Sequence, residues 1–183
     1  ILEFRQPGHS YTRYSNPTHA VLERALADLE GGEAAMATAS GMAAIHGAML
    51  SLVRAGDEVL APAALYGGTL GMLATVMPRY DIGYRLVRSG DSEAVVAAMG
   101  PRTRLVWLET IANPTTEMPD IAAIVEAAKT RGIPVVVDNT FASPYLCNPL
   151  TLGVELVIHS LTKYIGGHSD LIGGAIIGSA QRV

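Results

Sequence analysis

The chain has 183 residues, of which 49% are hydrophobic and 16% are charged. This composition excludes a disordered chain and is typical of one globular domain with a substantial core. The net charge of -4 gives no electrostatic reason to expect a nucleic-acid partner, and the longest uncharged run, residues 34–53, has the small and polar residues of a buried helix rather than of a membrane span.

The chain begins with an arm and a helix. Residues 1–17 lack apolar periodicity and are expected to be extended. Thr18 can cap a helix over residues 19–30. The apolar face of this helix would consist of Val21, Leu22, Leu26 and Leu29.

The rest of the chain alternates strands with helices. Apolar runs bounded by turn residues predict seven strands, at residues 34–38, 58–62, 82–87, 105–109, 134–138, 154–159 and 174–178. Helices are expected between most of them, over residues 42–53, 66–77, 92–99 and 120–130. No linker divides the chain. The alternation predicts one α/β domain with a mostly parallel sheet wrapped by helices, and such sheets bind ligands at the carboxyl ends of their strands.

A single cysteine, Cys147, excludes an internal disulfide. One unpaired thiol fits a reducing compartment, and no basic and apolar leader is visible at the start of the chain. We therefore expect a cytoplasmic protein without a membrane partner.

Residues with chemical uses follow the expected strands. They are Gly41, Met42, Tyr66, Glu109, Asn113, Asp138, Ser160, Thr162 and Lys163. Gly41 and Met42 would present backbone N–H groups at a helix N-terminus, which favours an anion such as phosphate. Ser160 and Thr162 would add hydroxyl groups to the same site.

Lys163 stands just beyond a buried strand, where desolvation would lower the pKa of a lysine and leave an amine that can condense with an aldehyde. Asp138 ends an apolar run and needs a donor, such as a protonated ring nitrogen. Tyr66 offers a flat face for stacking and a phenol for proton transfer. Asn113 can donate to a phenolate oxygen. Together these groups suit pyridoxal phosphate (PLP).

Each of these residues also has a structural interpretation. Ser-Gly before a helix is usually a cap, an aspartate at a strand end is usually a turn residue, and a lysine is usually on the surface. Their order along successive strands favours the cofactor site. His46 is interpreted as a core histidine. His159 and His168 lack the spacing of metal ligands, so no metal is expected.

Several segments resemble the transsulfuration (Cys/Met metabolism) family of PLP-dependent enzymes, which includes cystathionine γ-lyase, cystathionine γ-synthase and methionine γ-lyase. The resemblance covers essentially the whole chain and rests on residues 11–18, 40–42, 65–69, 137–140, 160–164 and 167–170. Gly68 stands where methionine γ-lyases typically carry a cysteine. The family implies a fold-type-I large domain, here residues 31–183, and a C-terminal small domain that is absent from this chain.

The family pattern implies a role for each matching residue. Lys163 would bind PLP covalently and later move protons between substrate carbon atoms. Asp138 would pair with the pyridine nitrogen, and Tyr66 would stack on the ring and help to remove a proton from the incoming amine. Asn113 would contact the ring oxygen, with Glu109 nearby as support. The phosphate would be bound by Gly41, Met42, Ser160 and Thr162.

The family also implies an assembly. Tyr11 and Arg13 would reach the phosphate of a neighbouring subunit, so residues 1–30 would make inter-subunit contacts. The active unit would be a homodimer, and the expected assembly is a homotetramer. The arginine that binds the substrate carboxylate would lie in the small domain, outside these 183 residues.

The implied reaction takes place on the side chain of a sulfur amino acid. We expect β/γ-elimination, in which a C–S lyase turns cystathionine, methionine or homocysteine into a 2-oxo acid and ammonia. One alternative is γ-replacement by a cystathionine γ-synthase or an O-acyl-homoserine sulfhydrylase. This alternative stays open because the small domain, which lies outside this chain, would decide between elimination and replacement. Another is a PLP-binding fragment that is catalytically incompetent by itself. A sheet protein without chemistry is disfavoured by the joint presence of Tyr66, Asp138 and Lys163.

Overall fold

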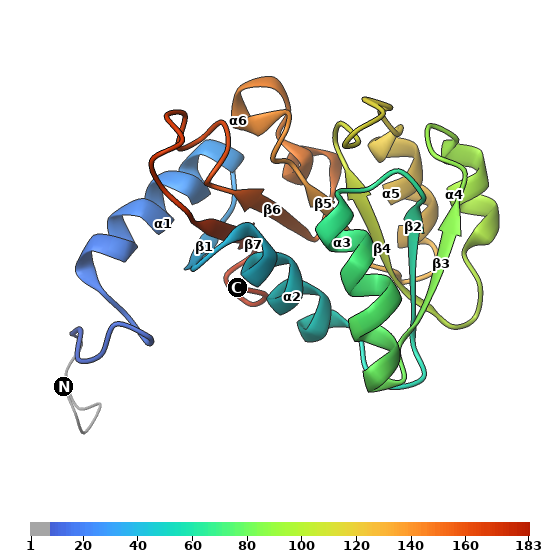
Figure 1. Ribbon diagram of the computed structural model, residues 1–183, viewed down its shortest axis with the longest axis horizontal. Helices are drawn as coiled ribbons and strands as arrows, with labels where there is room; N and C mark the ends of the chain where they lie inside the picture. The colour runs from blue at the N-terminus through green and yellow to red at the C-terminus, as the bar shows by residue number, and fades with distance from the viewer. Residues whose placement is uncertain (1–7) are drawn as a thin grey trace.

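The computed structural model describes residues 8–183, and residues 1–7 of the expected arm lie outside the described part. Seven strands form one sheet in the spatial order β1-β7-β6-β5-β4-β2-β3 (Figure 1). In chain order they are β1 (Ala34–Thr38), β2 (Glu58–Pro62), β3 (Gly83–Val87), β4 (Thr103–Glu109), β5 (Val135–Asp138), β6 (Leu156–Ser160) and β7 (Gly174–Gly178). All seven expected strands are therefore confirmed, with small differences at their ends.

Most neighbouring strands are parallel, as predicted. β2 is parallel to β3 and β4, and β5 is parallel to β4 and β6. β7 is antiparallel to both β6 and β1. The carboxyl ends of β1, β2, β4, β5 and β6 consequently lie at one edge of the sheet, which is the edge where such sheets bind ligands.

Helices occupy the connections between the strands. Within the described residues they are α1 (Pro17–Glu30), α2 (Gly41–Leu52), α3 (Gly67–Gly71), α4 (Ser92–Ala98), α5 (Ile121–Lys129) and α6 (Ser143–Leu146). A π-helical turn at Met72–Val76 and a 3-10 turn at Met77–Tyr80 follow α3, so the helix expected over 66–77 is divided into three parts. α6 and a 3-10 turn at Pro149–Leu152 were not expected. Across residues 8–183, no helix has both the length and the apolar character that a bilayer span requires.

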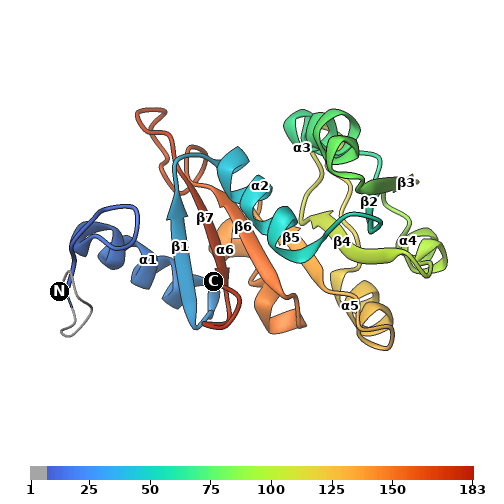
Figure 2. The same cartoon turned by 90° about the horizontal axis from the view of Figure 1, so that it is seen from below.

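The helices cover both faces of the sheet (Figure 2). On one face, α1, α4 and α5 pack on a core that includes Leu26, Val106 and Val157. On the other face, α2 and the helical turns from α3 onward pack on a core that includes Trp107 and Ile158. Successive residues of a strand alternate between these cores because a pleated strand points its side chains to opposite faces.

The first helix begins earlier than predicted. Its cap is Asn16, whose Oδ1 accepts hydrogen bonds from the N–H groups of Thr18 (2.9 Å) and His19 (3.3 Å). Pro17 fits the first turn, since its missing N–H would have no partner there and its backbone angle is already helical. The prediction that Thr18 caps this helix is therefore wrong, and Thr18 lies inside it.

The predicted apolar face of α1 is mostly uncovered within the chain. Only Leu26 is buried, whereas Val21, Leu22 and Leu29 are 72%, 38% and 58% exposed. The reason is that α1 lies at the lateral edge of the sheet, where it packs mainly on β1 and β7. His46 was predicted in the core but is only partly buried, because it lies beside the face of α2 that packs on the sheet.

Candidate active site

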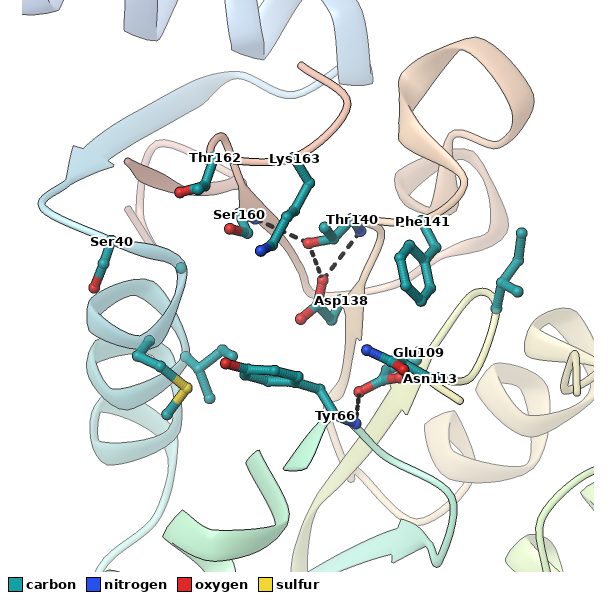
Figure 3. A pocket seen from close by; sticks show the side chains of 14 residues that line it. Ser40, Tyr66, Glu109, Asn113, Asp138, Thr140, Phe141, Ser160, Thr162 and Lys163 are labelled. Atoms are coloured by element: carbon teal, nitrogen blue, oxygen red, sulfur yellow. Dashed lines mark hydrogen bonds between the residues drawn. The ribbon is translucent and has the colours of Figure 1, made fainter. Parts of the chain in front are cut away.

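A cavity of about 360 Å³ opens at the edge of the sheet where β1, β4, β5 and β6 end. The predicted site residues that line it are Gly41, Met42, Tyr66, Glu109, Asn113, Asp138, Ser160, Thr162 and Lys163. Figure 3 shows the ring of Tyr66 on one side, the side chain of Lys163 reaching in from the opposite side, and Asp138 between them. The topology brings these distant residues together because the strands that precede them end at the same edge.

Asp138 is the last residue of β5 and is buried beneath the cavity. Its Oδ1 accepts hydrogen bonds from the backbone N–H (3.0 Å) and the hydroxyl (2.5 Å) of Thr140, while Oδ2 receives no hydrogen bond from residues 8–183. Burial raises the pKa of Asp138, and the bonds from Thr140 and the charge of His159 offset only part of this rise. A cationic group against Oδ2 would therefore stabilise the ionised carboxylate.

Lys163 lies in the turn that follows β6, where its backbone N–H donates to the carbonyl of Ser160 (3.2 Å). Its side chain is exposed and lines the cavity. The desolvation predicted for this lysine is not found, because β6 ends at Ser160 and the following turn carries the chain out of the core. The amine is thus free to react within the cavity but is not buried by the described chain.

Glu109, the last residue of β4, connects two other cavity residues. Its Oε1 accepts a hydrogen bond from the N–H of Tyr66 (2.6 Å), and its Oε2 accepts one from the N–H of Asn113 (2.9 Å). Burial raises the pKa of Glu109 to about 7; these two bonds lower the pKa and the charge of neighbouring Asp138 raises it further. The carboxylate therefore connects the backbone of Tyr66 to that of Asn113.

The N-terminus of α2 faces the cavity. The N–H groups of Gly41 and Met42 have no acceptor among residues 8–183 and lie at the positive end of the helix dipole. A Cβ on Gly41 would lie 2.7 Å from the Cβ of Ser160, so glycine is what allows the helix to begin against the end of β6. The hydroxyl of Thr162 accepts a hydrogen bond from the N–H of Gly173 (3.1 Å).

Tyr11 and Arg13 do not line the cavity of their own chain. Both are exposed, and the guanidinium of Arg13 lies 5.2 Å from the ring centre of Tyr11 and 5.8 Å from that of Tyr14. Their predicted contact is with a neighbouring subunit, so it stays a prediction.

Sequence reasoning missed four residues that line the cavity, Ile45, Ile111, Thr140 and Phe141, and it identified Ser40 only as a helix cap and as part of the matching segment 40–42. The Asp-x-Thr spacing was a usable signal for Thr140, because aspartate side chains commonly bond to groups two residues later. The apolar residues gave no signal, since an apolar side chain in a site cannot be told from one in a core by residue type.

Among residues 8–183, no three or more His, Cys, Asp or Glu side chains are grouped so that they could hold a metal ion. The donor set of the cavity does fit PLP. The free Oδ2 of Asp138 suits a protonated ring nitrogen, the free N–H groups of Gly41 and Met42 suit a phosphate, and the amine of Lys163 suits an aldehyde.

Comparison with known proteins agrees with this chemistry. Residues 2–183 match the family of Cys/Met metabolism PLP-dependent enzymes. The chain is 51% identical over 170 residues to the cystathionine γ-synthase of Mycobacterium tuberculosis, a match that covers 93% of this chain and 44% of that protein.

Two crystal structures share the fold. Cystathionine γ-lyase from Lactobacillus plantarum, complexed with L-serine, superposes with a TM-score of 0.92 at 42% identity. The match covers 97% of this chain and 46% of the lyase chain. A Campylobacter jejuni protein that contains N'-pyridoxyl-lysine-5'-monophosphate superposes with a TM-score of 0.91 at 34% identity, and the match covers 99% of this chain and 45% of that one. The chain spans less than half the length of each of these proteins. The sequence match and the fold-type-I large-domain architecture indicate the same family. The chain belongs to the family of Cys/Met metabolism PLP-dependent enzymes.

Proposed function

We propose that this chain is the cofactor-binding part of an enzyme that acts on the side chain of a sulfur amino acid or of an activated homoserine. The observation that carries this proposal is the placement of Lys163, Asp138 and Tyr66 around one cavity. When bound, PLP supplies an electron sink for negative charge that develops on the substrate carbon next to the amine.

The residues of the chain divide the work of binding and proton transfer. Lys163 holds the cofactor covalently and then moves a proton between substrate carbons. Asp138 keeps the ring nitrogen protonated, and Tyr66 covers the ring and takes a proton from the incoming amine. Asn113 donates to the ring oxygen. The phosphate is held by Gly41, Met42, Ser160 and Thr162.

The first candidate reaction is elimination, a C–S lyase activity on cystathionine, methionine or homocysteine that yields a 2-oxo acid and ammonia. Similarity to the cystathionine γ-lyase structure supports it. The second candidate is γ-replacement, which the 51% identity to a cystathionine γ-synthase favours. Both reactions begin with the same proton removal at Cα, so the same described residues serve either.

The proposal extends to assembly and place of action. Residues 1–30 form the arm and helix that contact a neighbouring subunit, and residues 31–183 form the PLP-binding domain. The uncovered apolar side of α1 supports a homodimer in which Tyr11 and Arg13 complete the partner's phosphate site, and two dimers form a tetramer. The single cysteine supports a cytoplasmic enzyme.

Product analysis of the full-length protein tests the proposed function. Release of a 2-oxo acid and ammonia from cystathionine, methionine or homocysteine identifies elimination. Formation of a new thioether from an O-acyl-homoserine and a thiol identifies replacement. A protein that binds PLP but gives neither product would contradict the proposed reactions and leave a binding protein.

A further inference from the structure

A buried polar cluster lies behind the cavity, at the ends of β5 and β6. Glu30 ends α1, His159 is in β6, and Asn139 directly follows β5; all three are fully buried. The Oε1 of Glu30 lies 2.5 Å from Nε2 of His159 and accepts a hydrogen bond from Nδ2 of Asn139 (2.8 Å). This cluster lies outside the cavity, whose lining includes none of the three residues.

The cluster and the cavity use alternate residues of the same strand ends. Ser160 shares a face of β6 with Ile158, in the core on the α2 side, whereas His159 shares the opposite face with Val157, in the core on the α1 side. Asp138 and Asn139 are likewise successive at the end of β5. Any group that fixes Asn139 and His159 from behind therefore fixes the backbone of Asp138 and Ser160.

Glu30 connects this backbone to the N-terminal helix. Besides its contacts with His159 and Asn139, its Oε2 lies 3.4 Å from Nδ2 of Asn148, which also donates to the carbonyl of Leu29 (2.8 Å). A carboxylate and an imidazole without access to water are costly to bury unless they are paired, and here Oε1 of Glu30 pairs with Nε2 of His159 while Nδ1 of His159 has no partner among residues 8–183. The end of α1 is thus tied to both site strands.

The same cluster adds charge next to Asp138. Burial raises the pKa of Asp138, hydrogen bonds from Thr140 lower it, and the charge of His159 lowers it too. The other titratable groups around this pair are Glu30 from α1, Glu109 from the neighbouring strand β4, and Lys163, which lines the same cavity as Asp138. Cys147 is also close, and burial and Glu30 raise the pKa of its thiol. Protonation of His159 against Glu30 would place a positive charge behind β5, the sign of charge that lowers the pKa of Asp138.

We propose that Glu30 and His159 are positioning residues for the cofactor site: this buried pair holds the ends of β5 and β6 in register and places an ionisable imidazole behind Asp138, and so makes cofactor binding and its pH dependence depend on the docking of α1. The inference rests on the proposed function, because it assigns Asp138 to a ring nitrogen. Neither residue touches the cavity, so both act through their neighbours in the chain.

The test compares Glu30→Gln and His159→Gln with Glu23→Gln in the full-length protein. Glu23 is a matched control: it lies on the same helix and its Oε1 accepts a hydrogen bond from Ala37 in β1 (2.9 Å), and within residues 8–183 no hydrogen bond joins it to β5 or β6. PLP affinity is measured by titrating cofactor-free protein across a pH series. Amide hydrogen exchange at Ser160, whose N–H donates to Thr140, is followed without cofactor.

Both cluster variants should bind PLP about tenfold to a hundredfold more weakly at pH 6, as expected for the loss of a hydrogen-bonded charge. The acidic limb of the affinity profile should move up by about one pH unit, because Asp138 should ionise at a higher pH once the Glu30–His159 pair is broken. Exchange at Ser160 should speed up about tenfold. Glu23→Gln should match the parent protein in all three measurements.

A purely structural cluster would lower affinity equally at every pH, and an unmoved acidic limb in Glu30→Gln or His159→Gln would overturn the proposal. The proposal is also overturned if neither variant folds, since the pair would then serve the fold as a whole. If the parent protein binds no PLP, the proposed function fails, while exchange at Ser160 still decides whether the pair positions the strand ends.

Discussion

At the scale of single residues, Glu109 is the side chain on which the arrangement of the cavity depends most visibly. Its two oxygens accept the N–H groups of Tyr66 and Asn113, which come from different loops. Its pKa of about 7, raised above the usual 4.5 mainly by burial, means that folding keeps the proton on Glu109 at pH values where the unfolded chain has lost it. The stabilising contribution of the protonated group is complete below pH 4.5 and is lost as the pH rises to about 7.

Glu109→Gln should therefore remove a pH dependence of stability. In the cofactor-free parent protein, Glu109 should lower the free energy of unfolding by about 3 kcal/mol between pH 4.5 and pH 7. The variant should lack this fall, as measured by urea unfolding at several pH values. Glu93→Gln, on the exposed start of α4, is the control and should keep it. Parallel pH profiles for the parent protein and Glu109→Gln would refute this account.

Thr140 joins the two site strands through one hydroxyl, which donates to Asp138 and accepts from the N–H of Ser160. Thr140→Val keeps the shape but removes both bonds, so it should lower the free energy of unfolding by about 1–3 kcal/mol. Thr130→Val, which removes an exposed hydroxyl at the end of α5, should stay within about 0.5 kcal/mol of the parent. Chemical denaturation measures both, and equal losses would contradict the role of Thr140.

At the scale of elements, the start of α2 is specified by a close approach that only glycine permits. Gly41→Ala would place a Cβ 2.7 Å from the Cβ of Ser160, which forces the helix N-terminus and the end of β6 apart. Affinity for PLP should fall at least about tenfold, as for a displaced binding group. Fluorescence or absorbance titration of the cofactor-free protein measures this effect.

Gly47 provides the matched control in the same helix. A Cβ there would meet only Cδ1 of Ile176, at 3.6 Å, which is ordinary contact. Gly47→Ala should leave PLP affinity unchanged and stabilise the protein by about 0.5–1 kcal/mol through helix propensity. If both alanine variants bind PLP as the parent does, the N-terminus of α2 is not the phosphate site.

The strands could be predicted from the sequence, but several helical features could not. Apolar runs such as residues 135–137 are buried on both faces of the sheet. Such a run predicts a strand whichever strands lie next to it. The predicted cap of α1 was Thr18 and the observed cap is Asn16. Either side chain can cap a helix, and the backbone conformation determines which of them does so. The π and 3-10 turns after α3 bury Met72, Leu73 and Met77 in the core, and local propensity did not predict this change of helix type.

At the scale of the whole molecule, the chain leaves an apolar surface at one end of the sheet. Val21 and Leu29 on α1 are 72% and 58% exposed. The proposed dimer would cover this surface. Val21→Asp should therefore weaken the dimer, because it places a charge in an apolar contact between subunits. Sedimentation of the full-length protein should show a smaller species at micromolar concentration.

Tyr80→Asp is the control for that prediction. Tyr80 is 53% exposed and lies beside β3, at the opposite end of the sheet from β1. This variant should sediment like the parent protein. If Val21→Asp does so as well, α1 is not in the subunit contact.

Most of the candidate site could be predicted because parallel strands bring their carboxyl ends to one edge, whatever the loops do. The polar residues at those ends, such as Asp138 and Lys163, were therefore identified from the sequence. The pairing of Glu30 with His159 could not be predicted, because 129 positions separate them and either alone is compatible with a surface. The exposure of Lys163 was also unpredictable, since it depends on the path of the turn after β6.

The most direct test of the whole account is to locate the covalent cofactor. The 183 residues contain two lysines, Lys129 and Lys163, and only Lys163 lines the cavity. After PLP is bound to the full-length protein and reduced with borohydride, peptide mass analysis should find the pyridoxyl group on Lys163. The label should persist in Lys129→Ala and be lost in Lys163→Ala. A label on Lys129, or undiminished labelling of Lys163→Ala, would contradict the assignment of this cavity as the cofactor site.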